Sequence, residues 1–177
     1  NDEANRDKIR QRGITNIANV GDLARVITPN PDGISFTDKF IDYAVRVYEI
    51  EVDAGGIVLK AGIVRNCLIV CNSAYYGGGI RAEGGSVENC RIAYNWASKG
   101  GGGICAYSTS ISGSLIHNNS SALYGGGGVY VTTGGGVIDK CTIVSNTSST
   151  FGGGVSAGNI GGLTIRNSRI SANTSSQ

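Results

Sequence analysis

A nine-residue line recurs five times in this chain of 177 residues and limits its fold more than any other feature. Each copy begins with Val or Ile, carries Ile at its sixth position and ends in Asn at its ninth. The copies are Val64–Asn72, Val87–Asn95, Ile111–Asn119, Ile138–Asn146 and Ile165–Asn173. Successive copies begin 23 to 27 residues apart, which is the size of one coil of a β-solenoid.

Runs of glycine separate the five lines. Four triplets, each followed by Ile or Val, begin at Gly77, Gly101, Gly126 and Gly152, and a weaker precursor lies at Gly55–Ile57. Glycine supplies 29 of the 177 residues, more than twice the average usage of about 7%. Such triplets indicate sharp turns with unusual dihedral angles, or a backbone crowded against the neighbouring coil.

Together the two motifs predict an all-β solenoid, a right-handed parallel β-helix of about five coils. Coils stacked at the strand spacing of about 4.8 Å would align equal positions into ladders along the axis. The β-branched residues at the sixth position suit a pleated interior. This predicted isoleucine ladder consists of Ile69, Ile92, Ile116, Ile143 and Ile170. Two further apolar ladders begin at Val64 and Ile80.

The Asn residues at the ninth position predict an inward amide ladder. An amide at such a turn can hydrogen-bond to the amides above and below it, and it tolerates left-handed dihedral angles. The members are Asn72, Asn95, Asn119, Asn146 and Asn173. The fourth position carries only Cys or Ser. Neighbouring Cys67 and Cys90 would lie close enough for a disulfide, but the Ser residues in the same column favour unpaired, buried thiols.

The GGG[IV] triplet followed by IxxN, with Cys or Ser two residues before the Ile, resembles the repeat of right-handed parallel β-helix proteins of the pectate-lyase-like superfamily. In particular, it is similar to the GGA[ILV] and FxxN repeat of bacterial polymorphic outer-membrane proteins. Here Gly replaces the Ala and Ile replaces the Phe. The resemblance covers about residues 55–173 and implies the β-helix fold far more strongly than any activity.

Residues 1–54 lack the repeat, and we expect them to form an N-terminal α+β cap or assembly segment before a β-helix over 55–177. Apolar residues within 15–27 follow a helical spacing. A turn cluster at 29–33 precedes one or two strands expected over 45–52. A cap would cover the first coil edge, which is otherwise a template for aggregation; the alternative is a segment that pairs with another copy.

Acidic residues are scarce after residue 53, where only Glu83, Glu88 and Asp139 occur. Enzymes with this fold need clustered carboxylates, which bind Ca²⁺ or act as general acid and base. Glu88 and Asp139 share one column but would lie two coils, about 9.6 Å, apart, which favours a charge-paired surface over a catalytic pair. We interpret the single histidine, His117, as an exposed strand residue. The sequence therefore predicts no catalytic residue, no metal site and no cofactor.

Aromatic residues precede the glycine runs. They are Tyr75 and Tyr76, Tyr124, and Phe151, and Lys99 takes that place in the second coil. Rings spaced along a solenoid could stack on sugar rings or on a neighbouring molecule. Tyr76, Tyr124 and Phe151 are therefore candidate surface-binding residues, with a carbohydrate as the ligand. The alternative is that the rings cover the backbone of the adjacent glycine turn.

Three functions compete: a structural or adhesive surface protein, a polysaccharide lyase or hydrolase, and a carbohydrate-binding module. The scarcity of carboxylates counts against the enzyme. We therefore expect a non-enzymatic, secreted or cell-surface structural protein, adhesin-like and bacterial by its resemblance, that self-associates into a fibre.

Charge patterning favours a head-to-tail contact. Residues 1–53 carry seven basic and ten acidic side chains, a net charge of −3, whereas residues 54–177 carry eight and three, a net charge of +5. Opposite charges steer two such surfaces together, and the strand expected over 45–52 could pair with the last coil of a neighbour. The small net charge predicts no nucleic-acid partner, and the lack of an apolar run of about 20 residues predicts no transmembrane segment.

Overall fold

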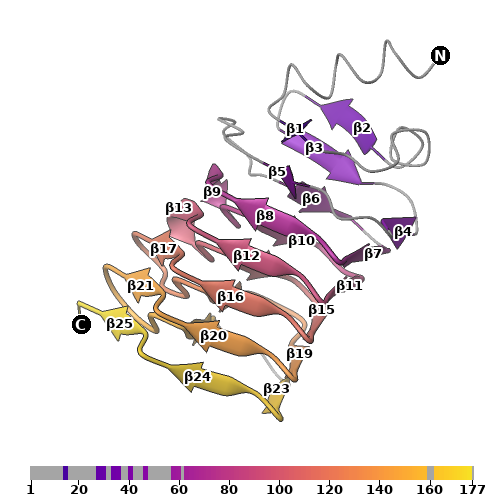
Figure 1. The fold of residues 1–177 in the computed structure, drawn as a ribbon. Helices are drawn as coiled ribbons and strands as arrows, with labels where there is room; N and C mark the ends of the chain where they lie inside the picture. The colour runs from indigo at the N-terminus through magenta and orange to yellow at the C-terminus, as the bar shows by residue number, and fades with distance from the viewer. Residues whose placement is uncertain are drawn as a thin grey trace, which may run out of the picture.

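The chain forms a parallel β-solenoid whose coils stack along one axis (Figure 1). The computed structural model describes residues 57–60, 62–158 and 162–176 with their side chains, and five short strands between residues 14 and 47 by their backbone. From residue 57 on, each of five coils contributes one strand to each of four sheets. The predicted all-β class and the number of coils are thus confirmed, and no helix occurs in the described part of the chain.

Two of the sheets contain seven strands each. Sheet A consists, in spatial order, of β1 (Ile14–Thr15), β5 (Arg46–Val47), β8 (Leu68–Val70), β12 (Arg91–Ala93), β16 (Leu115–His117), β20 (Thr142–Val144) and β24 (Arg169–Ser171). Sheet B consists of β2 (Ile27–Asn30), β3 (Gly33–Phe36), β6 (Ile57–Leu59), β10 (Ile80–Ala82), β14 (Ile104–Ala106), β18 (Val129–Val131) and β22 (Val155–Ala157).

The other two sheets are slightly smaller. Sheet C consists of β4 (Phe40–Ile41), β7 (Ile63–Arg65), β11 (Ser86–Glu88), β15 (Thr109–Ser112), β19 (Gly136–Asp139) and β23 (Leu163–Arg166). Sheet D consists of β9 (Ser73–Tyr76), β13 (Trp96–Gly100), β17 (Ser120–Ser121), β21 (Thr147–Ser148) and β25 (Thr174–Ser175).

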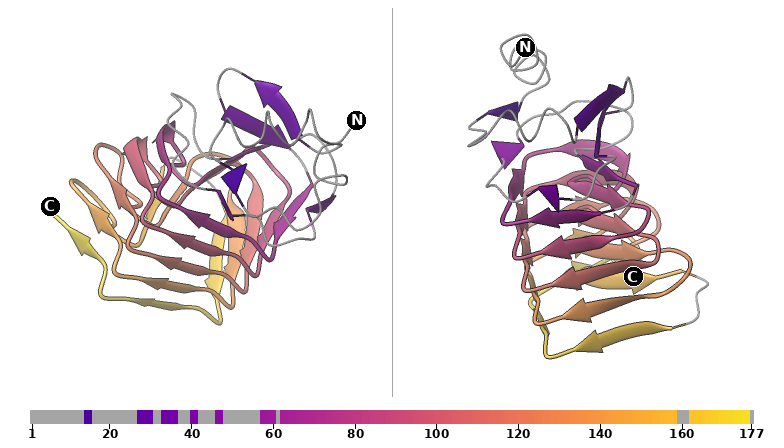
Figure 2. Two further views of the ribbon diagram at one scale, coloured as in Figure 1. Left: turned by 45° about the horizontal axis from the view of Figure 1, so that its top comes forward. Right: turned by 90° about the vertical axis from the view of Figure 1, so that its right-hand side faces the viewer.

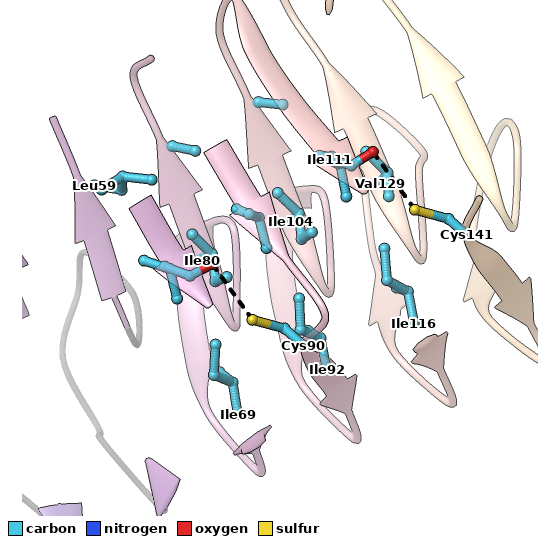
Figure 3. Packing of buried hydrophobic residues seen from close by; sticks show 14 of the residues in the cluster. Leu59, Ile69, Ile80, Cys90, Ile92, Ile104, Ile111, Ile116, Val129 and Cys141 are labelled. Carbon is cyan, nitrogen blue, oxygen red and sulfur yellow. Dashed lines mark hydrogen bonds between the residues drawn. The ribbon is translucent and has the colours of Figure 1, made fainter. Parts of the chain in front are cut away.

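The predicted isoleucine ladder runs in register through sheet A, where Ile69, Ile92, Ile116, Ile143 and Ile170 pair in sequence. The first four are fully buried and belong to the hydrophobic core, and Figure 3 shows Ile69, Ile92 and Ile116 within it. The expectation that the whole ladder is interior is wrong for the last coil, since Ile170 is 41% exposed and Ile165, in the neighbouring ladder, is 42% exposed. No described coil stacks below these two residues.

The amide ladder is confirmed, and its hydrogen bonds run along the whole stack. The Nδ2 atoms of Asn72, Asn95, Asn119 and Asn146 each donate to the Oδ1 atom of the Asn in the next coil, at 2.9–3.0 Å. Their backbone N–H groups donate to the same oxygens. Every internal amide therefore links two coils, while Asn173 is only half-buried.

The left-handed dihedral angles fall one residue before the Asn position, not on it. The eighth residues of the five lines have φ between 53° and 58°, and they are Cys71, Tyr94, Asn118, Ser145 and Ala172. Non-glycine residues seldom adopt this region. The side chains of the Asn residues instead form the amide ladder. Its hydrogen bonds fix the Asn next to each left-handed residue and so hold that residue in place.

The glycine triplets serve both purposes expected of them. Gly126, the first residue of its triplet, has φ of +63°. A Cβ atom on the second residue, Gly127, would overlap Thr147 O and lie 2.5 Å from Gly153 O, and one on Gly128 would lie 2.6 Å from Gly154 O. Backbone carbonyls of the neighbouring strands and coil thus fill the space that a side chain would need.

Differences in coil length lie outside the nine-residue lines. The nine residues of each line turn from sheet C through sheet A to sheet D without insertion, so the Asn and Ile ladders keep their register. Some additional residues of the longer coils lie within β13, where the register shifts between Ala97 and Gly100. Others lie between sheets D and B and between sheets B and C, as in the segment 132–135 that joins β18 to β19.

The N-terminal strands lie at the opposite end of the stack from the last coil (Figure 2). β3, β4 and β5 pair in parallel with β6, β7 and β8, and they continue three sheets of the solenoid. β2 and β1 then add antiparallel strands to sheets B and A. The turn expected at 29–33 corresponds to the β2–β3 hairpin, in which Asn30 pairs with Gly33.

Other N-terminal expectations lie outside the described residues. The segment with helical spacing, 15–27, is described only at its two ends, which lie in β1 and β2. Most of the strand expected over 45–52 also lies outside the described residues. Its described part, β5, lies between β1 and β8 in sheet A. Both edges of this part of the strand already bind strands of its own chain, so Arg46–Val47 are not free to pair with a neighbour's last coil.

Candidate functional site

A surface that we call the tyrosine face gathers five tyrosines from three coils: Tyr75, Tyr76, Tyr107, Tyr124 and Tyr130. The rings of Tyr76 and Tyr124 stack with centroids 6.1 Å apart and planes 7° apart, and Tyr124 stacks on Tyr130 at 6.2 Å. The Tyr75 ring meets that of Tyr76 edge-on at 5.3 Å.

Gly100 explains how Tyr76 and Tyr124 meet although they belong to coils two apart. Gly100 pairs with Tyr76 on one side and with Gly125 on the other, so no side chain separates the rings. A Cβ atom on Gly100 would lie 2.9 Å from the ring of Tyr130. The rings therefore also cover the glycine backbone, as the alternative interpretation of these aromatics expects.

Two cations lie over this face. The Lys99 Nζ atom is 5.1 Å from the Tyr75 ring centroid and 5.7 Å from that of Tyr124, and the Arg81 guanidinium lies 5.8 Å from the Tyr107 centroid. Cations at these distances are attracted by the negative face of an aromatic ring. The face thus presents both aromatic and positively charged groups to a ligand.

Three tyrosines of this face, Tyr76, Tyr107 and Tyr130, have raised pKa values and are neutral over the physiological pH range. Burial raises the pKa of Tyr76 to about 12, and the neighbouring tyrosines add to the effect. Burial likewise raises the pKa values of Tyr107 and Tyr130. Their hydroxyl groups are therefore hydrogen-bond donors as well as acceptors.

The structure brings together two of the three aromatic residues predicted for binding. Tyr76 and Tyr124 stack directly, whereas Phe151 is exposed and no ring contact joins it to another described aromatic residue. Tyr107 and Tyr130 were not predicted, because neither precedes a glycine run. The alternation of side chains along a strand could have predicted the position of Tyr130. It lies between the inward-facing Val129 and Val131 of β18 and must therefore point outward.

The three carboxylates of the described solenoid are all held by surface partners. Glu83 accepts from Lys60 at 2.7 Å and from Arg81 at 2.9 Å, and Glu88 accepts from the Ser86 hydroxyl at 2.7 Å. Glu88 and Asp139 do share the predicted column, with Ser112 between them.

Asp139 lies two coils after Glu88, and its partners belong to the coil that follows it. It accepts from Asn167 Nδ2 at 2.9 Å and lies 3.4 Å from Arg166 Nη2. The hydrogen bond from Asn167, with the nearby Arg166 charge, lowers the pKa of Asp139. Asp139 is therefore ionised at neutral pH, which is unlike a general acid that must hold a proton there.

His117 is buried, contrary to the expectation of an exposed residue. It is 9% exposed and lies on β16, beside Ala93 and Val144 of the adjacent strands. Its Nε2 atom accepts from Arg91 Nε at 3.1 Å, and the ring of Tyr94 packs edge-on against it. Long side chains of the preceding coil, Arg91 and Tyr94, thus cover this outward-facing position.

We expect His117 to make the stability of the protein depend on pH. Burial and the Arg91 charge lower its pKa in the folded state, so folding favours the neutral ring. Its contribution is complete above its unfolded pKa of about 6.5 and is lost as the pH falls through the lower folded value. The unfolding free energy of wild type should therefore fall more steeply below pH 6.5 than that of His117→Gln, and parallel pH profiles would contradict this expectation.

The five cysteines form no disulfide. Cys67, Cys90 and Cys141 occupy the fourth-position column with Ser114 and are buried, which confirms the preference for unpaired thiols in this column. A hydrogen bond with Cys67, followed by burial, raises the pKa of Cys90. Burial also raises the pKa of Cys141, so the thiols of Cys90 and Cys141 are protonated and poor nucleophiles.

Among the residues that the structure describes, no group of three or more His, Cys, Asp or Glu side chains is placed to bind a metal ion. Within the same residues, no helix has the length and apolar character needed to cross a membrane. No family model, curated protein or solved structure matches this chain.

Proposed function

We propose that this protein is a non-enzymatic structural protein of the cell surface or extracellular space, in which the solenoid acts as a rigid body. The observation that carries the proposal is where the repeated residues point. The positions that recur from coil to coil are the Ile, Asn and Cys or Ser ladders and the glycine triplets, and these line the interior or form the turns. The repeat therefore encodes stacking.

The outward positions show no such repetition. The column on sheet C reads Arg65, Glu88, Ser112, Asp139 and Arg166. Side chains of this column differ in charge and size from one coil to the next, so they present no row of equal groups to a substrate. The paired state of the three carboxylates gives the non-enzymatic assignment further support.

The extracellular location and the finer kinship of the fold are parts of the same proposal. Both draw on the resemblance to the pectate-lyase-like superfamily and to the repeats of bacterial polymorphic outer-membrane proteins. The replacement of their Ala by Gly suits the geometry of this chain, because a Cβ atom on Gly103 would lie 2.6 Å from Gly128 O.

Incubation of the pure protein with polyuronates and neutral polysaccharides tests the non-enzymatic assignment. We expect no new reducing ends and no new unsaturated products, measured by end-group assay and ultraviolet absorbance. Cleavage that Glu88→Gln or Asp139→Asn abolishes would overturn the proposal, because these variants retain the shape of the side chain and remove its charge.

Carbohydrate binding without catalysis is a second candidate function, and the tyrosine face is the observation that favours it. Exposed Tyr75 and Tyr124 provide aromatic surface, and Lys99 lies between their rings. If this candidate is correct, Tyr124→Ala should weaken binding to an immobilised polysaccharide roughly tenfold, since a stacked ring contributes about 0.5–1.5 kcal/mol beyond the area it buries.

Tyr94→Ala is the matched control for this measurement. Tyr94 is also an exposed tyrosine, but its ring contacts His117 and it lies outside the tyrosine face. An equal loss of binding in both variants, or binding that neither variant changes, would argue against the tyrosine face as the site.

A further inference from the structure

Two phenol rings of the tyrosine face stack in parallel although their coils are not adjacent. Tyr76 ends β9 and Tyr124 follows β17, and β13 lies between these two strands in sheet D (Figure 1). The ring centroids are 6.1 Å apart and the ring planes 7° apart. Gly100 of β13 places no side chain between them. The two phenols are therefore neighbours across three coils of the solenoid.

The other rings near this pair do not offer the same arrangement. The Tyr130 ring also stacks on Tyr124, but both residues belong to one coil. The hydroxyl end of Tyr130 lies toward the following coil, where a Cβ atom on Gly158 would be 3.1 Å from its oxygen. The equivalent position before the next glycine triplet is Phe151, which has no phenol. Among the described residues, Tyr76 and Tyr124 are thus the stacked phenols that join different coils.

The surroundings of the pair suit the formation of neutral radicals. Tyr124 is 46% exposed and Tyr76 is partly exposed, so a dissolved oxidant can reach this surface. The raised pKa of Tyr76 keeps its phenol protonated at neutral pH, and its oxidation therefore releases a proton together with the electron. The Lys99 charge, 5.7 Å from the Tyr124 centroid, disfavours a cationic ring. Two neutral radicals do not repel each other and can couple.

We propose that Tyr76 and Tyr124 are a site of oxidative cross-linking, where a peroxidase and hydrogen peroxide from the surroundings join the two rings as dityrosine. Each phenol loses one electron and one proton and becomes a phenoxyl radical. A carbon–carbon bond forms between one Cε atom of each ring, the Cε–H bond at each of these atoms breaks, and the two hydrogens end on the phenolic oxygens. Hydrogen peroxide takes up the two electrons and two protons and becomes two molecules of water.

The cross-link would clamp three coils of the stack together. A bond between residues 76 and 124 closes a loop in the unfolded chain and so lowers the conformational entropy of that state. The folded solenoid loses little, because its two rings are already held side by side. The modification would therefore reinforce the rigid body of the proposed structural function, although its chemistry does not depend on that function.

Treatment of dilute pure protein with a haem peroxidase and hydrogen peroxide tests the proposal, with Tyr124→Phe and Tyr94→Phe as a matched pair. Both variants remove one hydroxyl group from an exposed tyrosine and keep the ring, but Tyr124 stacks on another phenol and Tyr94 contacts His117. Equal thermal unfolding curves before treatment show that both variants are folded.

We expect treated wild type and Tyr94→Phe to gain the fluorescence of dityrosine while they stay monomeric. Mass spectrometry should show the loss of two hydrogen atoms and a cross-linked peptide that joins Tyr76 to Tyr124. The treated proteins should also unfold at a higher temperature than the untreated ones. Tyr124→Phe should lose most of the monomeric dityrosine and the rise in unfolding temperature.

Three results would overturn the proposal. They are dityrosine that forms only between molecules, equal yields of monomeric dityrosine in the two variants, and cross-linked peptides that join other tyrosines in place of Tyr76 and Tyr124. None of these results bears on the non-enzymatic assignment, because the polysaccharide assay tests it separately.

Discussion

Replacing Ile116 by Ala should lower the free energy of unfolding by about 2–5 kcal/mol, as other buried large-to-small replacements do. Ile116 is fully buried between Ile92 and Ile143. Its Cγ2 atom would lie 3.1 Å from a Cβ atom built on Gly103, so the ladder is packed against the glycine turn as well. Little can move to fill the cavity, and equilibrium urea unfolding measures the loss.

Ile170→Ala is the matched control, because it removes the same side chain from the same ladder position in the last coil. Ile170 is 41% exposed, so water would enter the space left by the side chain. We expect this variant to lose no more than about 1 kcal/mol. Equal losses for the two variants would show that burial in the ladder does not govern stability.

Asn119→Ala should destabilise the protein by about 3 kcal/mol or more, because it leaves several buried groups without partners at about 1–3 kcal/mol each. Asn119 Oδ1 accepts from the backbone N–H and the Nδ2 atom of Asn95, at 3.0 and 2.9 Å. Its own Nδ2 atom donates to Ile92 O and to Asn146 Oδ1. Asn119 is 1% exposed, so bulk water cannot take the place of these bonds.

The corresponding control is Asn173→Ala in the last coil. Asn173 also accepts two hydrogen bonds from Asn146 and donates one to Ile143 O, but it is half-buried, so water can replace its amide. We expect a clearly smaller loss of stability. Faster hydrogen exchange at the Asn95 N–H in Asn119→Ala would locate the effect, and a loss below about 1 kcal/mol in that variant would contradict the argument.

The interior of the solenoid could be predicted from the sequence because the repeat fixes it. A position that recurs in every coil must stack on itself, so Ile92, Ile116 and their counterparts could be assigned to one ladder from the repeat alone. The repeat does not show which coils are covered by another coil on both sides. The exposure of Ile165 and Ile170 follows from stacking and not from residue type.

Surface features depended on side chains that the repeat does not fix. His117 is buried because Arg91 and Tyr94 of the preceding coil lie over it. The residue types at these two positions of the line are not the same in every coil. The stack of Tyr76 on Tyr124 depends on Gly100, where the absence of a side chain lets rings of alternate coils meet. Single-sequence reasoning could propose Tyr76 and Tyr124 as exposed aromatics but could not place them in contact.

The N-terminal strands show a different limit. β3, β4 and β5 lie in register on the first repeat coil, although residues 1–54 contain no IxxN line. Strand pairing uses backbone groups that every residue except proline carries in full. A segment without the motif can therefore continue the sheets, and a search for the motif cannot find it.

Because the length differences lie outside the nine-residue lines, the number of coils is an adjustable property of this molecule. The ladders keep their register whether a coil has 23 or 27 residues, so neighbouring coils fit without regard to the length of their turns. Duplication or deletion of a whole coil would preserve the Ile and Asn ladder contacts on either side of the change. The molecule can thus be lengthened or shortened in steps of about 4.8 Å, with one Asn of the amide ladder for each coil.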